Sequence, residues 1–159
     1  VVLANGSMRS NFNNEGKIRE EMIKKDVVEV IISFPGNLFL NSQIPVCLWF
    51  LTNDKTQKGR NRKGETLFID AKQMGTTVSK QWRLLTDKDI SRISDTVQSW
   101  RNKKDYADLP GFSYGAKFEE IKKNNFILTP ASYVGVLLDF EEDLRKLVFV
   151  DVIDFILVD

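Results

Sequence analysis

Histidine, the side chain that most often transfers protons in enzymes, does not occur among the 159 residues. Its absence excludes Ser-His-Asp and Cys-His arrangements, histidine general bases and histidine metal ligands. The single cysteine, Cys47, lies in an apolar run, so we interpret it as a buried structural thiol, which favours a reducing, cytoplasmic compartment. Consecutive carboxylates at Glu141-Glu142-Asp143 would point in different directions on a helix and indicate a solvated helix start. We therefore expect neither catalytic residues nor a metal site in this chain.

A run of cations is the second feature that could do chemistry. Clustered cations with glycines between them can follow a nucleic-acid backbone. A solvated hairpin loop is the alternative, and the net charge of only +1 is too low for a stand-alone nucleic-acid binder. The cations that would contact phosphates are Lys55, Lys58, Arg60, Arg62 and Lys63.

The third feature is the segment FPGNLFLNSQIPVCLWFL, which runs from Phe34 to Leu51. Two apolar stretches flank a short polar gap, and Pro35 and Pro45 restrict the backbone on either side of it. An ordinary turn would explain this pattern. A loop that holds a ligand at the end of a sheet would explain it equally well.

The surrounding residues predict the elements that position this loop. A β-branched run at Val27–Phe34 and a second apolar run at Pro45–Leu51 indicate strands buried on both faces. They are too close in sequence for a helical crossover, so we expect antiparallel neighbours. A strand at Val1–Ala4, a helix at Lys17–Lys25 and a returning strand at Glu65–Ala71 complete the end of an α/β sheet with an antiparallel last strand.

The second half of the chain has helical patterning. Thr86 to Asp89 resembles a helix start, followed by an apolar stripe of Ile90, Ile93 and Val97, and a short helix is expected near Phe118–Lys123. The tail from 146 to 159 is typical of β structure. We place a boundary between residues 1–75 and 76–159. Because the chain begins inside an apparent strand without an initiator methionine, we interpret it as a fragment.

Four segments resemble one family: VVLANGSM, GKIREEMIKKDVVEVIISFPGNLFLNSQIPVCLWFL, GETLFIDA and NNFILTPASYVG. They are similar to the modification subunit of type I restriction–modification systems, an adenine-N6 DNA methyltransferase that uses S-adenosylmethionine. The resemblance covers most of residues 1–136. It implies the C-terminal part of a Rossmann-like sheet (1–75), followed by a mostly helical region (76–159) that begins the family's assembly region. The implied partners are DNA and the specificity and restriction subunits.

The resemblance also implies which residues matter. The family binds its cofactor with an F-x-G-x-G loop and the target amino group with an N-P-P-[FY] loop, and this sequence contains neither. We therefore expect no cofactor-binding residue here and no activity of the chain alone. Related enzymes stack the flipped base on an aromatic between the last two strands, a place held here by Phe39. Asn37, Asn41 and Ile44 would line the same wall; the alternative is that Phe39 caps the core.

A non-catalytic role is the second hypothesis. The strand at Val1–Ala4 would leave an open apolar sheet edge that pairs with another subunit or with a second copy of the chain. Asn5 and Ser7 would lie on the sheet edge where α/β folds bind ligands, although a hydrogen bond that closes the turn is the alternative. No apolar run reaches the roughly 18 residues that a membrane helix needs, so no membrane partner is expected.

Overall fold

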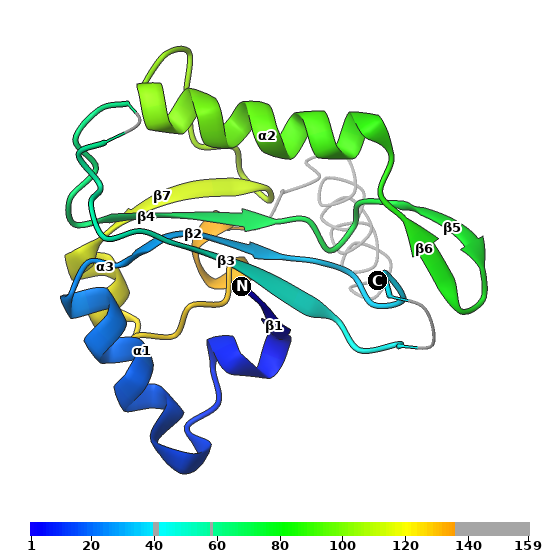
Figure 1. The fold of residues 1–159 in the computed structure, drawn as a ribbon, viewed down its shortest axis with the longest axis horizontal. Helices are drawn as coiled ribbons and strands as arrows, with labels where there is room; N and C mark the ends of the chain where they lie inside the picture. The colour runs from blue at the N-terminus through cyan, green and yellow to red at the C-terminus, as the bar shows by residue number, and fades with distance from the viewer. Residues whose placement is uncertain (40–41, 58, 136–159) are drawn as a thin grey trace, which may run out of the picture.

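A computed structural model of the chain describes residues 1–39, 42–57 and 59–135 (Figure 1). Its main feature is a five-stranded sheet with the strand order β1-β3-β2-β4-β7. β2 and β4 are parallel, and every other neighbouring pair is antiparallel. The strands are β1 (Val2–Ala4), β2 (Val28–Ser33), β3 (Val46–Leu51), β4 (Glu65–Asp70) and β7 (Ser113–Lys117).

The central strands confirm the prediction of a mixed α/β sheet that ends in an antiparallel strand. All six residues of β2 are buried, as the run of β-branched side chains predicts. β3 pairs antiparallel with β2, but burial alternates along it: Cys47 and Trp49 are buried, while Leu48 and Phe50 are only half-buried. The prediction that β3 is buried on both faces is therefore wrong, because the face that carries Leu48 and Phe50 lines an open apolar groove beside α2.

The position of β4 corrects a second prediction. β4 was expected to return in a hairpin beside β3, but it pairs in parallel with β2, from Val30 opposite Leu67 to Ser33 opposite Asp70. Residues 52–64 therefore connect β3 to β4 on the other side of β2. Because β2 and β4 are parallel, both end at the same edge of the sheet.

Helices cover both faces of the sheet (Figure 1). On one face, a core that includes Ile23 and Ile121 packs below the strands, and on the other, Val97 and Trp100 pack above them. The first helix begins at Glu15 and not at Lys17. The helices are α1 (Glu15–Lys24), α2 (Asp87–Asn102), α3 (Phe118–Lys123) and α4 (Ala131–Val134), with short 3-10 turns η1 (Asn5–Met8) and η2 (Phe12–Asn14).

Two helices follow from local sequence signals. Thr86 caps α2: its Oγ1 accepts a hydrogen bond from the Asp89 backbone N–H at 3.2 Å, and the Asp89 carboxylate accepts one from the Thr86 N–H at 2.9 Å. α3 spans the predicted residues. In α1, Ile23 is buried, whereas Ile18 is 56% exposed.

A second sheet was not predicted. β5 (Thr76–Ser79) and β6 (Trp82–Leu84) form a two-stranded hairpin that projects beyond the main sheet (Figure 1). The division at residue 75 stays a prediction; β7, from the second segment, pairs with β4 from the first. The carboxylates at 141–143 and the tail lie outside the described residues. No helix in the described ranges combines the length and hydropathy that a membrane span requires.

Candidate functional site

The loop that follows β2 lies at the carboxyl edge that β2 and β4 share. We call residues 34–45 the edge loop. Its two arms are held together where they leave the sheet, because the Phe34 N–H donates to the Val46 carbonyl at 2.8 Å. At Gly36 the arms are so close that a Cβ would lie 2.3 Å from the Gln43 carbonyl oxygen. Only glycine fits there, so the edge loop forms a narrow projection from the sheet.

Two of the predicted base-binding residues point away from the core. Phe39 is 50% exposed and Ile44 is 61% exposed, and neither belongs to the two core clusters. The Phe39 carbonyl accepts a hydrogen bond from the Ser42 N–H at 3.0 Å, which closes the tip of the loop. Asn41 lies outside the described residues. The geometry leaves the Phe39 ring available to a ligand, whereas a core cap would be covered.

Asn37 lies in a hollow of about 510 Å³ at the base of the edge loop. Its backbone is left-handed, with φ of 63°, and its carbonyl accepts a hydrogen bond from the Arg83 N–H at 2.8 Å. Asn5, from the end of β1, lines the same hollow, as its predicted place at this edge requires. The Oδ1 atoms of Asn5 and Asn37 are buried, and neither has a hydrogen-bond partner within the described ranges. A buried oxygen without a hydrogen bond lowers the stability of the fold unless a ligand or water donates one to it.

The hollow also contains residues that the sequence reasoning missed. The signal that could have found them is their place directly after β4, whose carboxyl end meets the edge loop. The Asn5 Oδ1 atom accepts no hydrogen bond that would close its turn within the described ranges. The Ser7 hydroxyl contacts the Cys47 sulfur at 3.4 Å. The missed lining residues are Lys72, Gln73 and Arg83.

The predicted run of cations lies at the opposite end of the sheet. We call residues 52–64 the basic loop. Lys55 is only 2% exposed, and its ammonium donates to the Asp26 carboxylate at 2.5 Å and to the Glu65 carbonyl at 2.6 Å. Arg62 is also 2% exposed and lies 3.2 Å from a Glu29 carboxylate oxygen. Burial and ion pairing leave the charged groups of Lys55 and Arg62 little access to a nucleic-acid backbone or to solvent, so backbone contact by this run of cations stays a prediction.

Glu29, the second residue of β2, is the centre of this network. Arg101 of α2 donates to both of its carboxylate oxygens, at 2.9 and 2.8 Å. Burial disfavours the carboxylate, but hydrogen bonds and positive charge from Arg101 and Arg62 outweigh that effect and hold the pKa of Glu29 below its ordinary value of 4.5. Burial lowers the pKa of Lys55, against the effect of the Asp26 carboxylate. A glutamate inside an apolar strand is a sequence signal for such partners.

The remaining cations of the basic loop differ in exposure. Arg60 donates to both carboxylate oxygens of Glu65, at 3.1 and 2.6 Å, and its guanidinium lies 5.5 Å from the centre of the Trp100 ring. Lys63 is exposed, and Lys58 lies outside the described residues. Within the described ranges, Lys63 is therefore the cation of this loop that is best placed to meet a phosphate.

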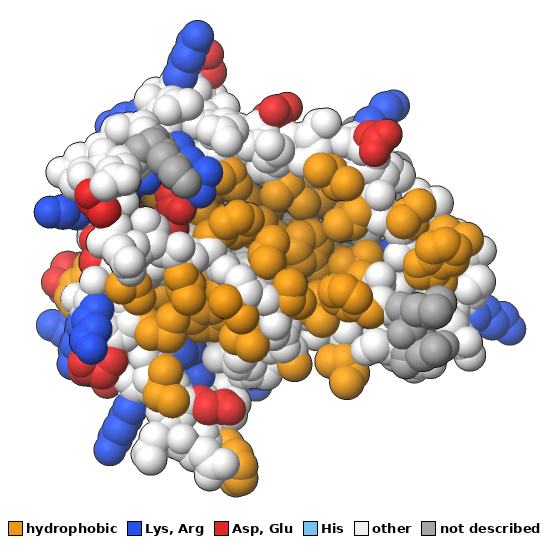
Figure 2. Space-filling view, viewed as in Figure 1, with side chains coloured by type: hydrophobic (Ala, Val, Ile, Leu, Met, Phe, Trp, Pro, Cys, Tyr) orange, Lys and Arg blue, Asp and Glu red, His pale blue; other side chains and the backbone are white. Residues whose placement is uncertain are grey.

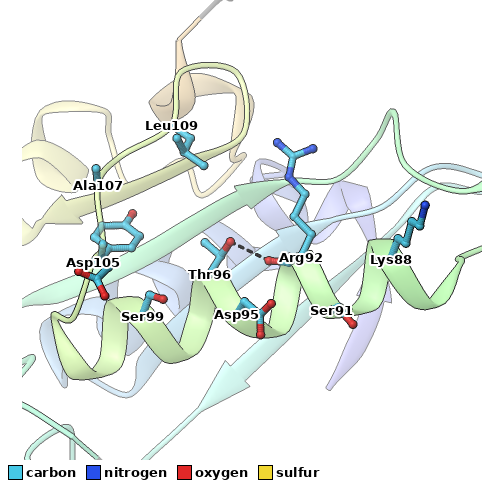
Figure 3. A pocket seen from close by; sticks show the side chains of 10 residues that line it. Lys88, Ser91, Arg92, Asp95, Thr96, Ser99, Asp105, Ala107 and Leu109 are labelled. Carbon is cyan, nitrogen blue, oxygen red and sulfur yellow. Dashed lines mark hydrogen bonds between the residues drawn. The ribbon is translucent and has the colours of Figure 1, made fainter.

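A shallow polar groove lies between α2 and residues 105–109 (Figure 3). The side chains from α2 spread along the helix and do not converge on one point, and the Thr96 hydroxyl bonds to the Arg92 carbonyl of its own helix at 2.7 Å. No group of three acidic or cysteine side chains that could hold a metal occurs in the described part of the chain. The groove therefore offers no arrangement for acid–base or metal chemistry.

The edge strand β1 and its neighbours leave apolar surface exposed. Val2 and Leu3 are 51% and 40% exposed. One apolar groove is lined in part by β1, and a second lies between α2 and the neighbouring strands β3 and β2; hydrophobic side chains gather in the middle of the face shown in Figure 2. One is lined by Val1, Leu3, Ile18, Met22, Trp49 and Leu51, and the other by Leu48, Phe50, Leu85, Ile90 and Ile93 among others.

Comparison with known proteins gives a consistent set of relatives. The profile of the N-6 DNA Methylase family matches residues 1–142. The chain is 47% identical over 135 residues to the type I restriction enzyme HindI methylase subunit of Haemophilus influenzae, covering 85% of this chain and 29% of that protein. It is 34% identical over 160 residues to the MjaIX methylase subunit of Methanocaldococcus jannaschii, covering 92% of this chain and 28% of that protein.

A solved structure agrees with these sequence relatives. The methyltransferase subunit of a type I restriction–modification system from Streptococcus thermophilus superposes with a TM-score of 0.70 at 28% identity, over 86% of this chain and 26% of that chain. The likeness confirms the expected α/β fold. The chain spans less than a third of the length of each of the two methylase subunits from Haemophilus influenzae and Methanocaldococcus jannaschii.

Proposed function

The chain belongs to the N-6 DNA methylase family, and we propose that it forms the distal part of the modification subunit of a type I restriction–modification system. The complete subunit would methylate adenine N6 in DNA with S-adenosylmethionine as methyl donor. Residues 1–75 would be the distal half of the catalytic domain, and residues 76–159 would begin the assembly region. DNA and the specificity and restriction subunits would be its partners.

The observation that carries this proposal is the edge loop. A base rotated out of a duplex needs a flat apolar surface, because stacking offsets part of the cost of unpairing. Phe39, half-exposed in the loop that follows β2, would supply such a surface, and Ile44 of the same loop is also exposed. Asn37 and Asn41 would line the same wall. The unpaired Oδ1 atoms of Asn5 and Asn37 are acceptors that suit N–H donors of a nucleotide.

The catalytic and cofactor-binding groups would come from other parts of the subunit. The sequence has neither F-x-G-x-G nor N-P-P-[FY]. The hollow at the edge loop is lined by two asparagines and by Lys72, Gln73 and Arg83, without a carboxylate for the hydroxyls of a nucleoside cofactor. These residues do not fit S-adenosylmethionine, so this chain would contribute the target-base wall and DNA contacts, and alone it would transfer no methyl group.

A second candidate function is subunit interaction without catalysis, and the edge strand β1 favours it. An apolar edge strand that lines an uncovered groove is ready to pair with another strand. We propose that the strand that pairs with β1 comes from another part of the same subunit. Self-association of the isolated chain through β1 is the competing outcome, and sedimentation at several concentrations would reveal it as a concentration-dependent dimer.

The test is transfer of a radioactive methyl group from S-adenosylmethionine to DNA. The full-length subunit, assembled with its specificity subunit, should label duplex DNA at adenine N6, and the isolated chain should not. Dose-dependent labelling by the isolated chain would disprove its inactivity. Absence of labelling by the full-length assembly would overturn the methyltransferase assignment and leave the interaction role.

A further inference from the structure

The β5–β6 hairpin carries large apolar side chains that are about half-exposed and belong to neither core cluster. All four residues of β5 are exposed, and Val78, Trp82 and Leu84 are 52%, 40% and 52% exposed. A two-stranded hairpin is only marginally stable by itself. Large apolar side chains gathered on such a small element mark an interaction surface.

The hairpin is fixed beside the edge loop. The Arg83 N–H donates to the Asn37 carbonyl at 2.8 Å, so a backbone hydrogen bond joins the two elements directly. The Arg83 guanidinium also donates to the carbonyls of Lys72 and Met74, at 3.4 and 3.3 Å, which ties the hairpin to the end of β4. At Gly75, with φ of 87°, a Cβ would lie 3.0 Å from the Arg83 side chain. The base of the hairpin is therefore held in one place.

The hairpin itself carries positive charge only. From residue 76 to residue 84 the chain has Lys80 and Arg83 and no acidic residue, whereas Lys72, before the hairpin, lies 3.9 Å from an Asp70 carboxylate oxygen. Lys80 lies at the turn between the two strands and is exposed. The basic loop differs, because the carboxylates of Asp26, Glu29 and Glu65 hold most of its cations. A phosphate backbone would be the natural counterion for the hairpin.

We propose that the β5–β6 hairpin is a DNA-contacting ribbon beside the target base. Lys80 binds a backbone phosphate, and Trp82 packs on a sugar or base that flanks the target adenine. A two-stranded ribbon is narrow enough to enter the major groove of DNA. The inference rests on the proposed function, which supplies DNA as the substrate, and adds an interaction surface outside the edge loop. The exposed cation Lys80 at the turn, with no acidic residue within the hairpin, favours DNA over a protein partner.

The test uses the full-length subunit assembled with its specificity subunit, with duplex DNA binding measured over a range of salt concentrations. Lys80→Gln should reduce the slope of log affinity against log salt by about 0.9, the value of one phosphate contact. Trp82→Ala should weaken binding roughly 5- to 100-fold, the cost of one lost stacking contact. Matched controls are Lys17→Gln and Phe12→Ala, which alter exposed residues in and near α1 and should bind like wild type.

Each outcome is decisive. If the wild-type assembly neither binds nor methylates DNA, the proposed function itself fails. If it does both, and K80Q and W82A bind like the controls, the hairpin inference fails alone. If K80Q and W82A lose binding to the specificity subunit while the DNA affinity of the free subunit is unchanged, the hairpin contacts a protein partner. That result would also overturn the inference. Lys80 makes no contribution to either core cluster, so K80Q decides the question even if W82A destabilises the fold.

Discussion

The edge loop and the basic loop lie at opposite ends of the sheet, and they differ in how exposed their most distinctive side chains are. The basic loop has the cations, yet Lys55 and Arg62 are buried against Asp26 and Glu29. The edge loop has no cation, yet its Phe39 is 50% exposed, and the buried Oδ1 atoms of Asn37 and of Asn5, which line the hollow at its base, have no hydrogen-bond partner within the described ranges. Availability of a group to a ligand thus depends on whether the fold has already supplied its partner.

The physical reason is the cost of burying charge. A cation removed from water must be paired, and once paired it has little capacity left for a phosphate. In the basic loop the pairs join β2, the loop and the C-terminal end of α2 through Glu29, Arg62 and Arg101. The comparison therefore favours a structural role for the basic loop and supports the proposal that the edge loop binds the target base.

The largest effect is expected from Glu29→Gln. The substitution leaves two arginines beside an uncharged amide, and the free energy of unfolding of the full-length subunit should fall by about 3–5 kcal/mol. Urea denaturation measures the loss. The matched control is Glu20→Gln, which removes an exposed pair with Lys24 and should cost less than about 0.5 kcal/mol. Equal losses for both variants would contradict a structural role for the basic loop.

Protonation of the Glu29 carboxyl tests its ion pairs with Arg62 and Arg101 without a substitution. Because the pKa of Glu29 is lower in the folded protein than its ordinary 4.5, the ion pair stabilises the fold fully above that pH. The stabilisation is lost as the pH falls through the folded-state pKa. The stability of the wild type should therefore fall more steeply below about pH 4.5 than that of Glu29→Gln. Parallel acid denaturation curves would show that Glu29 makes no such contribution.

Phe39→Ala tests the binding role proposed for the edge loop. Because Phe39 is half-exposed and outside both cores, its removal should change the free energy of unfolding little. Loss of one stacking surface should cost about 1–3 kcal/mol in the methylation step, roughly a 5- to 150-fold drop in kcat/KM of the full-length assembly. Phe12→Ala, at a residue 73% exposed outside the edge loop, is the control. A large loss of stability with unchanged methylation would return Phe39 to the core-cap interpretation.

The smallest effect is expected from Lys63→Gln. This exposed cation of the basic loop can give at most one phosphate contact, so the salt slope of DNA binding should fall by no more than about 0.9. Lys88→Gln on α2 provides a control for loss of one surface charge. A larger drop in slope would mean that the basic loop, despite its internal pairs, contributes a true DNA interface.

Local signals predicted the local elements well. The β-branched run predicted β2, and the Thr86 cap with the apolar stripe predicted α2, because hydrogen bonds and periodicity within a few residues decide these elements. Residues far apart in sequence decided what the sequence reasoning missed. Nothing near Glu65 says that β4 lies beside β2, and nothing near Lys55 shows that Asp26 will receive its ammonium.

The same difference between local and distant residues applies to the candidate site. Phe39, Ile44 and Asn37 could be predicted from the loop that contains them. The Arg83 N–H, in contrast, donates to the Asn37 carbonyl from a distant part of the sequence. The hairpin itself escaped prediction because its strands are only four and three residues long and carry no alternation that marks a buried face. An exposed ribbon lacks the pattern from which strands are predicted.

Amide hydrogen exchange of the full-length subunit with its specificity subunit, with and without its target DNA, compares the two loops in a single experiment. We predict that DNA slows exchange in residues 34–45 and leaves residues 52–64 unchanged. Slower exchange in 52–64 with no change in 34–45 would contradict the assignment of the two loops, and would give the DNA contact to the basic loop.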